Sequence, residues 1–577
     1  MPEFHSDRTL PHIPDDVTLE QFILGYRHEA RPRRPDFAPW LVADKTGRQI
    51  RLEEIQQRVT GLANGLHTHF GIRTLFITCG SRLFLKEYPI CIWAIHRLCA
   101  IVSPCNPTIT TAELTHQLLQ TRATSIIAHP DVRDLALASA GEAGIPPSHV
   151  IFFGSEDIES ADRAPDLSTV TGLTSYGLSL DSAALGRGRR LREGEGRTKI
   201  AFLSSSTKTT GKPKARISII LSISHFSVVA NVVQVATHCR VNEAYTSWEE
   251  RRYRPGDVCL AVLPFYHIYG LAIVIHFVLF SGMTLVVAPK FDLEDMLKSI
   301  VRYKISQLML LPPQVALLCK EPIERDYDLS GVHSILSGAA PLAADVTERL
   351  ISMLPKAHIG QAYGSTESTG IVSMWSTRTK RGYNAGELVP GIVARVVKPD
   401  GALAEHDEAG ELLVKTPSIA LGYLNDEDTT NEAFVDGWLH TGDQVTINQK
   451  NEIIYIDRLN EIIKVRGFEV APADLEACIL GHKLVQDVAV IAINNKLGGT
   501  APLAFVVLIA KASASCKGDP KNIRKIKNSI MTHVAERKSS YKQLHGVELV
   551  DEIPKDLSGK ILRRVLQDQL GIPTAKL

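Results

Sequence analysis

A-Y-G-S-T-E, at residues 362–367, follows a short apolar segment in the middle of an ordered series of polar motifs. S-G-A-A-P-L, at residues 337–342, has the same context. Small residues after a buried strand let the backbone approach a ligand closely. A lone Thr366-Glu367 pair is more often a helix cap, so a functional assignment depends on the whole series.

Five more motifs extend the series toward both ends of the chain. They are T-T-G-K-P-K (209–214), P-F-Y-H-I-Y-G (264–270), W-L-H-T-G-D (438–443), D-R-L-N-E-I-I-K-V-R-G-F (457–468) and S-G-K-I-L-R-R (558–564). The hydroxyls, backbone N–H groups and lysines of the first suit the β- and γ-phosphates of ATP. It is not a Walker P-loop, because G-x-x-x-x-G-K-[ST] is absent. Taken alone, this motif also fits a polar turn after a strand.

Apolar runs that alternate with amphipathic stretches indicate an α/β fold with mostly parallel sheets covered by helices. From residue 410 onward, G-E-L-L-V-K and N-E-I-I-Y-I-D-R are typical of antiparallel strands. After Arg458 the pattern changes to a small α+β unit, in which A-P-A-D-L-E-A-C-I-L opens a helix. A chain of 577 residues is also too long for one hydrophobic core, so two or more domains are expected.

Composition excludes several classes of protein. Hydrophobic residues make up 44% of the chain and charged residues 22%, which are the values of a soluble globular protein. A formal net charge of +1 gives no basic field for nucleic acid. The nine cysteines form no C-x-x-C pair, so a reduced compartment fits better than a disulfide framework.

One apolar stretch, residues 270–288, is long enough to cross a bilayer. His276, Ser281 and Gly282 interrupt it, and the segment from Gly282 to Pro289 has the pattern of a strand. We therefore expect a buried helix followed by a buried strand, and no membrane span.

The seven motifs in this order resemble the adenylate-forming superfamily, which includes acyl-CoA synthetases, 4-coumarate–CoA ligases, beetle luciferase and peptide-synthetase adenylation domains. The resemblance covers the chain from about residue 40 to its last residues. It implies that ATP activates a carboxylic acid as an acyl-AMP, which is then usually transferred to a thiol such as CoA. The most similar subgroup is that of the 4-coumarate–CoA ligase-like enzymes, particularly the fungal ones of secondary metabolism.

The resemblance also implies an architecture. A large N-terminal domain at residues 1–456 would bind AMP and the acid, and would combine stacked α/β subdomains with a small β-barrel-like part. Residues 457–460 would be a hinge. Residues 461–577 would form a mobile α+β lid that rotates between the two half-reactions.

Individual roles follow by the same resemblance. Lys560 would neutralise the carboxylate that attacks the α-phosphate, His267 would border the acyl carbonyl and the thiol tunnel, and Lys464 would serve the thiol step. Asp443 would accept hydrogen bonds from the ribose hydroxyls, with support from Arg458. The complete set of expected ATP- and AMP-binding positions is Ser204, Ser205, Thr209, Thr210, Gly211, Lys214, Gly338, Ala339, Ala340, Pro341, Gln361, Ala362, Tyr363, Gly364, Ser365, Thr366, Asp443 and Arg458.

The remaining expected positions concern the metal, CoA and the acid. Glu367 and Thr209 would hold Mg²⁺, which prefers oxygen ligands together with phosphates. The expected CoA-binding residues are Arg466, Gly467 and Phe468. The expected acid pocket consists of Tyr269, Gly338, Gly364, Gly370 and Ile371, and it indicates an aryl, medium-chain or branched acid.

The phosphate loop departs from the family pattern S-G-T-T-G-x-P-K-G, because its first glycine is missing and Ala215 replaces the last one. Two alternatives to CoA ligation therefore stay open. The enzyme would load a carrier protein or oxidise its adenylate, or it would be an impaired, non-catalytic member.

The chain ends in Ala575-Lys576-Leu577, a variant of the S-K-L tripeptide that a peroxisomal import receptor recognises. Three arbitrary residues are the simpler explanation. The terminal position, beyond the last folded motif, favours a peroxisomal address.

Overall fold

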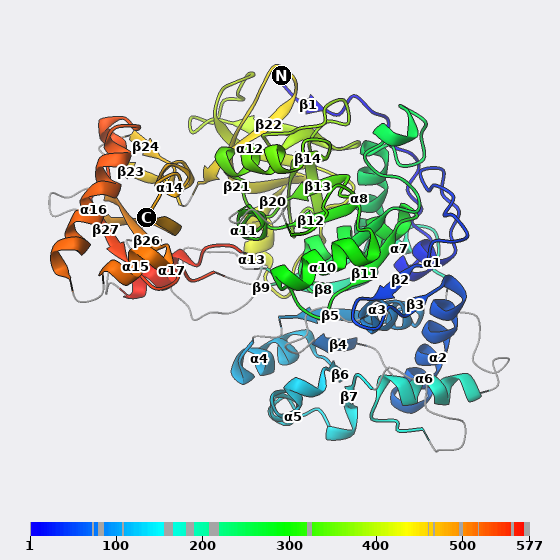
Figure 1. Ribbon diagram of the computed structural model, residues 1–577. Helices are drawn as coiled ribbons and strands as arrows, with labels where there is room; N and C mark the ends of the chain where they lie inside the picture. The colour runs from blue at the N-terminus through cyan, green and yellow to red at the C-terminus, as the bar shows by residue number, and fades with distance from the viewer. Residues whose placement is uncertain are drawn as a thin grey trace.

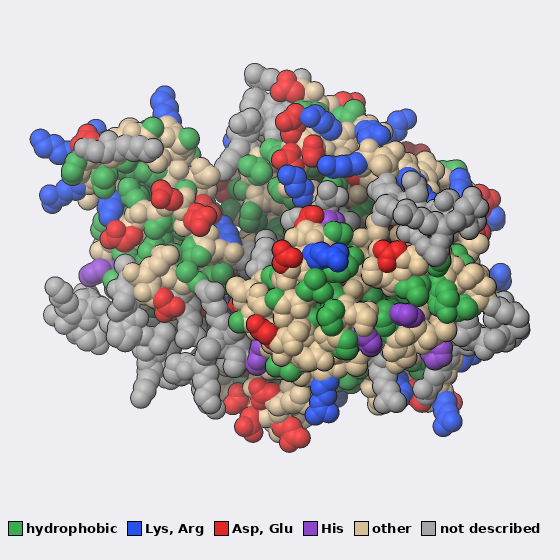
Figure 2. All heavy atoms as spheres, turned by 90° about the horizontal axis from the view of Figure 1, so that it is seen from below, with side chains coloured by type: hydrophobic (Ala, Val, Ile, Leu, Met, Phe, Trp, Pro, Cys, Tyr) green, Lys and Arg blue, Asp and Glu red, His purple; other side chains and the backbone are tan. Residues whose placement is uncertain are grey.

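The computed structural model describes residues 2–71, 74–78, 86–106, 109–154, 165–180, 190–206, 219–319, 326–459, 461–465, 468–494, 500–516, 519–555 and 559–569. Figure 1 shows a large body of sheets and helices with a smaller unit beside it, which the last part of the chain builds. Over the face drawn in Figure 2, acidic and basic side chains are interspersed among hydrophobic and polar ones.

A seven-stranded sheet forms one layer of the body, in the order β19-β9-β8-β5-β4-β6-β7. Its inner strands are parallel, whereas β9 runs antiparallel to β8. The strands are β4 (Thr74–Thr78), β5 (Ile101–Cys105), β6 (Ser125–Ala128), β7 (Val150–Phe152), β8 (Ile200–Ser206), β9 (Ile219–Ser224) and β19 (Gly422–Tyr423). The nearby helices include α2 (Leu52–Phe70), α3 (Glu87–Arg97), α4 (Thr111–Thr121), α5 (Arg133–Glu142), α6 (Val170–Ser179) and α8 (His225–His238).

A 15-stranded sheet joins a parallel half to an antiparallel half. The parallel half is β2 (Leu41–Ala43), β11 (Thr284–Val287), β10 (Val258–Ala261), β12 (Gln307–Leu310), β13 (Ser334–Ser337) and β14 (His358–Ser365). The antiparallel half includes β15 (Gly370–Met374), β16 (Gly386–Leu388), β22 (Glu452–Arg458), β21 (Trp438–Ile447), β18 (Gly410–Lys415), β17 (Val393–Val397) and β1 (Phe4–His5). The antiparallel pairing thus begins earlier than residue 410, directly after β14.

Residues 270–288 form a buried helix and a buried strand, as predicted. The helix is a π-helix, η4 (Tyr269–Phe277), followed by the short α9 (Val278–Phe280) and then β11. Gly270 permits the tight entry to it, because a Cβ there would lie 2.1 Å from the carbonyl oxygen of Pro264. Within the described ranges, no helix combines the length and the apolar composition that crossing a membrane requires.

The smaller unit has its own sheets and its own hydrophobic core. It contains β23 (Ile463–Val465), β24 (Phe468–Val470), α14 (Pro472–Leu480), β25 (Val485–Asn494), β26 (Thr500–Leu508), α15 (Ala510–Cys516), α16 (Pro520–Ala535), β27 (Gly546–Leu549) and α17 (Arg563–Gln569). We call it the lid. β22 of the large sheet ends at Arg458, and β23 already belongs to a separate sheet.

Three buried histidines pack between α3, α8 and η4. His225 accepts a hydrogen bond from the Leu19 N–H at 3.1 Å, and His276 accepts one from the Trp93 indole at 3.3 Å. The ring of His96 lies 4.8 Å from that of His225. Burial lowers the pKa of His225 to about 3 and that of His276 to about 4.

We expect acid to destabilise the fold through these histidines. Their folded pKa values lie below the unfolded value of 6.5, so the unfolded chain binds more protons and stability falls as the pH drops below about 6.5. For His225 the loss between about pH 6.5 and pH 4.5 should be roughly 2 kcal/mol. Chemical denaturation across this range measures it. His225→Gln should weaken the pH dependence, and an unchanged slope would contradict the assignment.

Candidate active site

Asp443 lies at the centre of the site, on β21. The antiparallel register places it directly opposite Arg458, the last residue of β22. The Asp443 side chain is buried; its Oδ1 lies 3.0 Å from Arg458 Nε, and its Oδ2 accepts a 2.6 Å hydrogen bond from the Tyr363 hydroxyl. Burial raises the pKa of Asp443, although Arg458, Tyr363 and the charge of Lys560 act in the opposite direction. The carboxylate is therefore held in one orientation by two different groups.

Tyr363 reaches Asp443 from β14, where the pairing with β15 shifts register between Tyr363 and Gly364. Its ring lies 6.2 Å from that of Tyr455 on β22, at an interplanar angle of 35°. Burial and the neighbouring Asp443 carboxylate raise the pKa of Tyr363 well above the ordinary tyrosine value. Tyr363 is thus a neutral hydrogen-bond donor at neutral pH, with its ring available for stacking.

The loop after β13 lies beside the end of β14, because Ser337 and Gln361 are partners in the parallel register. Ala339 adopts a left-handed φ of +71° in this loop. The Gln361 side chain accepts a hydrogen bond from the Leu342 N–H at 2.9 Å and donates one to the Tyr383 carbonyl at 3.1 Å. Gln361 therefore fixes the S-G-A-A-P-L loop with its side chain.

The expected acid-pocket residues also come together. A Cβ on Gly338 would lie 3.1 Å from the Tyr269 ring, and the Tyr269 hydroxyl donates to the Leu336 carbonyl at 3.2 Å. Gly364 packs against the Gly370 carbonyl, where a Cβ would approach to 1.9 Å. Ile371 is buried beside Gly370. None of the five residues carries a charge, since three are glycines and the others are Tyr269 and Ile371.

Asn231 is a residue that the motifs did not identify. Its amide donates to the Ile371 carbonyl at 2.9 Å and accepts from the Ile371 N–H at 3.1 Å. Gly370 has a φ of +131°, and a Cβ there would lie 2.3 Å from Asn231 Oδ1. Asn231 therefore pairs with the backbone of the acid-pocket strand as a neighbouring strand would. The sequence signal for it is an asparagine between the apolar residues of the segment that forms α8, where the structure buries its amide.

Tyr423 is another residue that the motifs did not identify, and it contacts Glu367. The Tyr423 hydroxyl donates to Glu367 Oε1 at 2.8 Å, and the Ala420 N–H donates to the Glu367 carbonyl at 2.9 Å. Both partners come from the segment around β19, far along the chain. Among the described residues, no group of three or more His, Cys, Asp or Glu side chains could hold a metal ion.

The lid brings Lys560 toward Asp443. Gly559, which precedes it, has a φ of +82°, and a Cβ there would lie 3.2 Å from Pro313 Cγ at the start of α11 (Pro312–Leu318). Lys560 is half-buried, and its charge is close enough to lower the pKa of Asp443. The loop of S-G-K-I-L-R-R therefore docks on the body beside the Asp443 site.

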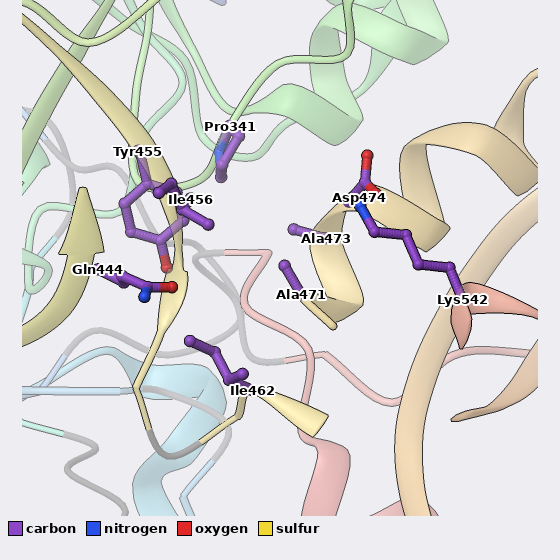
Figure 3. A pocket seen from close by; sticks show the side chains of 9 residues that line it. All are labelled: Pro341, Gln444, Tyr455, Ile456, Ile462, Ala471, Ala473, Asp474 and Lys542. Carbon is purple, nitrogen blue, oxygen red and sulfur yellow. Dashed lines mark hydrogen bonds and ion pairs between the residues drawn. The ribbon is translucent and has the colours of Figure 1, made fainter. Parts of the chain in front are cut away.

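A cleft of about 380 Å³ lies between the body and the lid. In Figure 3, Pro341, Gln444 and Tyr455 face it from the body, whereas Ala473, Asp474 and Lys542 face it from the lid. Ile456, Ile462 and Ala471 complete the lining. Pro341 belongs to the S-G-A-A-P-L loop and Tyr455 to β22, so the cleft borders two of the segments predicted to bind the nucleotide.

The other predicted residues lie in several places. His267 is half-buried two residues before η4, and its Nδ1 accepts a hydrogen bond from the Tyr269 N–H at 3.3 Å. Ser204 and Ser205 lie at the end of β8 opposite Leu221 and Ile220. Ala340, Ala362 and Thr366 are also among the described residues. The hydroxyl of Ser365 is hydrogen-bonded to that of Ser368. In the β23–β24 hairpin, the backbone of Lys464 lies opposite Glu469 and that of Phe468 lies opposite Val465. Outside the described residues lie Thr209, Thr210, Gly211, Lys214, Arg466, Gly467 and the terminal Ala575-Lys576-Leu577.

The family model described as AMP-binding enzyme matches residues 28–424, and the model of the AMP-binding enzyme C-terminal domain matches residues 474–560. The chain belongs to the AMP-binding enzymes. The resemblance to the adenylate-forming superfamily is thereby confirmed, together with the predicted α/β fold.

Named relatives of this AMP-binding enzyme are ligases. Acyl-CoA ligase AKT1 of Alternaria alternata is 31% identical over 96% of this chain and 95% of its own length. Peroxisomal OPC-8:0-CoA ligase 1 of Arabidopsis thaliana is 32% identical over 98% and 95%, respectively. The solved structure of the anthranilate CoA ligase AuaEII with anthranoyl-AMP has a TM-score of 0.78 and 20% identity, over 96% of this chain and 98% of that one. An adenylate-forming ligase is therefore the class of this enzyme, and ATP and CoA are the substrates that acyl-CoA ligases of this family use.

Proposed function

We propose that this enzyme is an acid–CoA ligase. A carboxylate attacks the α-phosphate of ATP to give acyl-AMP and pyrophosphate, and the thiol of CoA then displaces AMP to give acyl-CoA. The convergence of Asp443, Arg458 and Tyr363 from the body with Lys560 from the lid carries the proposal. The names of the relatives support the choice of CoA as acceptor.

In the adenylation step, each group has a separate task. Asp443, already oriented by Arg458 and Tyr363, accepts hydrogen bonds from the ribose hydroxyls. Tyr363 stacks on the base, and the Gly338–Pro341 loop lines the adenine side. Lys560 neutralises the attacking carboxylate and the charge that develops on the α-phosphate, which is the kind of aimed electrostatic effect that contributes most to many rates.

In the thiol step, we propose that the lid turns about residues 457–460. Lys560 then leaves, and the β23–β24 hairpin with Lys464, Arg466, Gly467 and Phe468 arrives at the acyl-AMP. His267 borders the acyl carbonyl from the body.

Mg²⁺ fits the arrangement around Glu367. Mg²⁺ is commonly bound by one or two carboxylates together with substrate phosphates and water, and a lone oriented carboxylate suits that pattern. Glu367 and the predicted Thr209 would hold the ion. When bound, it would neutralise phosphate charge.

We expect Tyr423→Phe to raise the Mg²⁺ concentration needed for half-maximal adenylation by about tenfold, since a hydrogen bond to a charged group contributes roughly 1.5 kcal/mol. The change removes only the hydroxyl that orients Glu367. Pyrophosphate exchange at varied Mg²⁺ measures the effect. Tyr303→Phe, which removes a hydroxyl bonded to the Asp44 carbonyl in another part of the body, is the matched control. Equal Mg²⁺ dependence in both variants would contradict the role of Tyr423.

The acid is proposed to be aryl, medium-chain or branched, and the pathway to be one of secondary metabolism. The uncharged lining formed by Tyr269, Gly338 and Ile371 supports an apolar tail. ATP–pyrophosphate exchange with benzoate, 4-coumarate, octanoate and 3-methylbutanoate tests adenylation, and mass spectrometry after addition of CoA tests the transfer. Exchange without a CoA ester would favour carrier-protein loading or adenylate oxidation. Absence of exchange with every acid would favour an impaired member.

We also propose a peroxisomal location, read by an import receptor from Ala575-Lys576-Leu577. A small residue, a cation and an apolar terminus with a free carboxylate suit a receptor groove. An N-terminal fluorescent fusion in the native host should be punctate, and deletion of the tripeptide should make it diffuse. A diffuse intact fusion would make the enzyme cytosolic instead.

A further inference from the structure

A buried arginine links three separate parts of the lid. Arg563 Nε lies 2.9 Å from Glu461 Oε2, and its Nη1 lies 3.0 Å from Glu476 Oε1. The three side chains are only 14%, 20% and 12% exposed, respectively. Glu476 also accepts a hydrogen bond from the Val490 N–H at 2.8 Å, which anchors it to β25.

The three linked residues lie close in sequence to the proposed hinge, to α14 and to Lys560. Glu461 comes directly after the proposed hinge at residues 457–460, and Glu476 lies on α14. Arg563 is the first residue of α17 and follows Lys560 by three residues. The link therefore ties the start of the lid to the segment that carries the catalytic lysine.

A second contact fixes the other side of Lys560. Gly559 packs against Pro313 of the body, at a distance that a larger residue could occupy only if Pro313 shifted. On the lid side, Leu566 of α17 is fully buried in the core with Ile491 and Phe505. Lys560 thus lies between a body contact at Gly559 and a lid anchor at Arg563.

An arginine is the residue that such an anchor requires. Its planar guanidinium can bond two carboxylates at once in a fixed geometry, whereas a lysine offers a single charge on a flexible stem. A buried pair of this kind often contributes no more net stability than well-packed apolar side chains would, although loss of one partner alone destabilises the fold. The best-attested use of such pairs is to fix the register of the elements that they join. The network is therefore better explained as a device for placement than as a source of stability.

We propose that Arg563, held by Glu461 and Glu476, is a positioning residue for Lys560 that couples the orientation of the lysine to the hinge. The inference rests on the proposed role of Lys560 in adenylation. Loss of the link lets the Lys560 loop shift while the lid stays folded. The adenylation half-reaction should suffer and the thiol half-reaction should not, because Lys560 has left the site by then.

Glu461→Gln is the first test, because it removes the charge next to the hinge and leaves the Arg563–Glu476 pair. Arg563→Lys is the second test, because it keeps a buried positive charge but removes the planar guanidinium that faces two carboxylates. A misplacement of this kind should lower ATP–pyrophosphate exchange about 10²-fold. Transfer to CoA from synthetic acyl-AMP, made from the best acid of the four-acid panel, should be unchanged. Lys527→Met, which breaks the Lys527–Glu548 pair elsewhere in the lid, should leave both rates unchanged.

Equal losses in both half-reactions, or no loss in either, would overturn the inference. Lys560→Ala, run in parallel, separates it from the proposed function. An unchanged adenylation rate in Lys560→Ala would contradict the proposed role of Lys560. A slow Lys560→Ala together with unchanged adenylation rates in the Glu461 and Arg563 variants would contradict only the positioning role of Arg563. Limited trypsin digestion needs no acid: Glu461→Gln should be cut faster after Lys560 than wild type, at a temperature well below the midpoint of thermal unfolding of both proteins. Unchanged cutting would also overturn the anchor.

Discussion

Lys560→Ala should lower the rate of acyl-AMP formation by about 10²–10³-fold, the loss that follows removal of one aimed charge-stabilising group. Lys560 lies on a loop that docks beside Asp443 through the Gly559–Pro313 contact. In the proposed adenylation step, its charge would lie where the carboxylate and the α-phosphate meet. Single-turnover measurement of acyl-AMP, with the best acid of the panel, gives the rate.

The same variant should transfer a supplied acyl-AMP to CoA at the wild-type rate. Lys298→Ala removes an exposed lysine from α10 (Leu293–Tyr303), whose partner is Glu294, and is the control for loss of a positive charge. If both half-reactions of Lys560→Ala slowed equally, a lid that exchanges Lys560 for the β23–β24 hairpin would be the wrong description.

Asp443→Ala should raise the KM for ATP by about 10- to 100-fold, because hydrogen bonds to a charged group contribute roughly 1.5–3 kcal/mol. The KM for the acid should change far less, since a ribose contact acts on the nucleotide alone. Pyrophosphate exchange at varied ATP and varied acid gives the two values. The change also leaves Arg458 and Tyr363 without their shared partner, so part of the effect is loss of their placement.

A buried carboxylate outside the site provides the control for Asp443→Ala. Asp257 is 8% exposed and accepts a hydrogen bond from the Gln307 amide at 2.8 Å. Asp257→Asn should lower stability without a change in either KM. An unchanged KM for ATP in Asp443→Ala would remove Asp443 from the nucleotide site.

The elements that the sequence predicted best are those with a local pattern. The buried helix and strand of residues 270–288 follow from their apolar run, and the helix at A-P-A-D-L-E-A-C-I-L is α14. The π-helical form of η4 was not predictable, because it depends on how closely Gly270 approaches Pro264 in three dimensions. The early start of antiparallel pairing at β15 likewise depends on which strand lies next to β14.

Some residues of the candidate site were predictable from the sequence and others were not. Asp443, Arg458 and Tyr363 lie in short motifs, and the structure brings them into contact, while their catalytic roles stay predictions. Asn231, Tyr423 and Arg563 act through contacts to residues distant in the chain. The local pattern does not reveal the partners of these residues, because the packing of α8, β19 and α17 sets them, even for Arg563 within S-G-K-I-L-R-R.

Transfer of oxygen from the acid to AMP tests the central claim most directly. An acid of the panel that carries ¹⁸O in both carboxylate oxygens is incubated with ATP, Mg²⁺, CoA and the enzyme. Mass spectrometry then measures the masses of the AMP and acyl-CoA products. Attack of the carboxylate on the α-phosphate followed by thiolysis predicts one heavy oxygen in AMP and one in the acyl-CoA. Unlabelled AMP, or heavy oxygen in inorganic phosphate with ADP as the nucleotide product, would contradict an acyl-AMP intermediate.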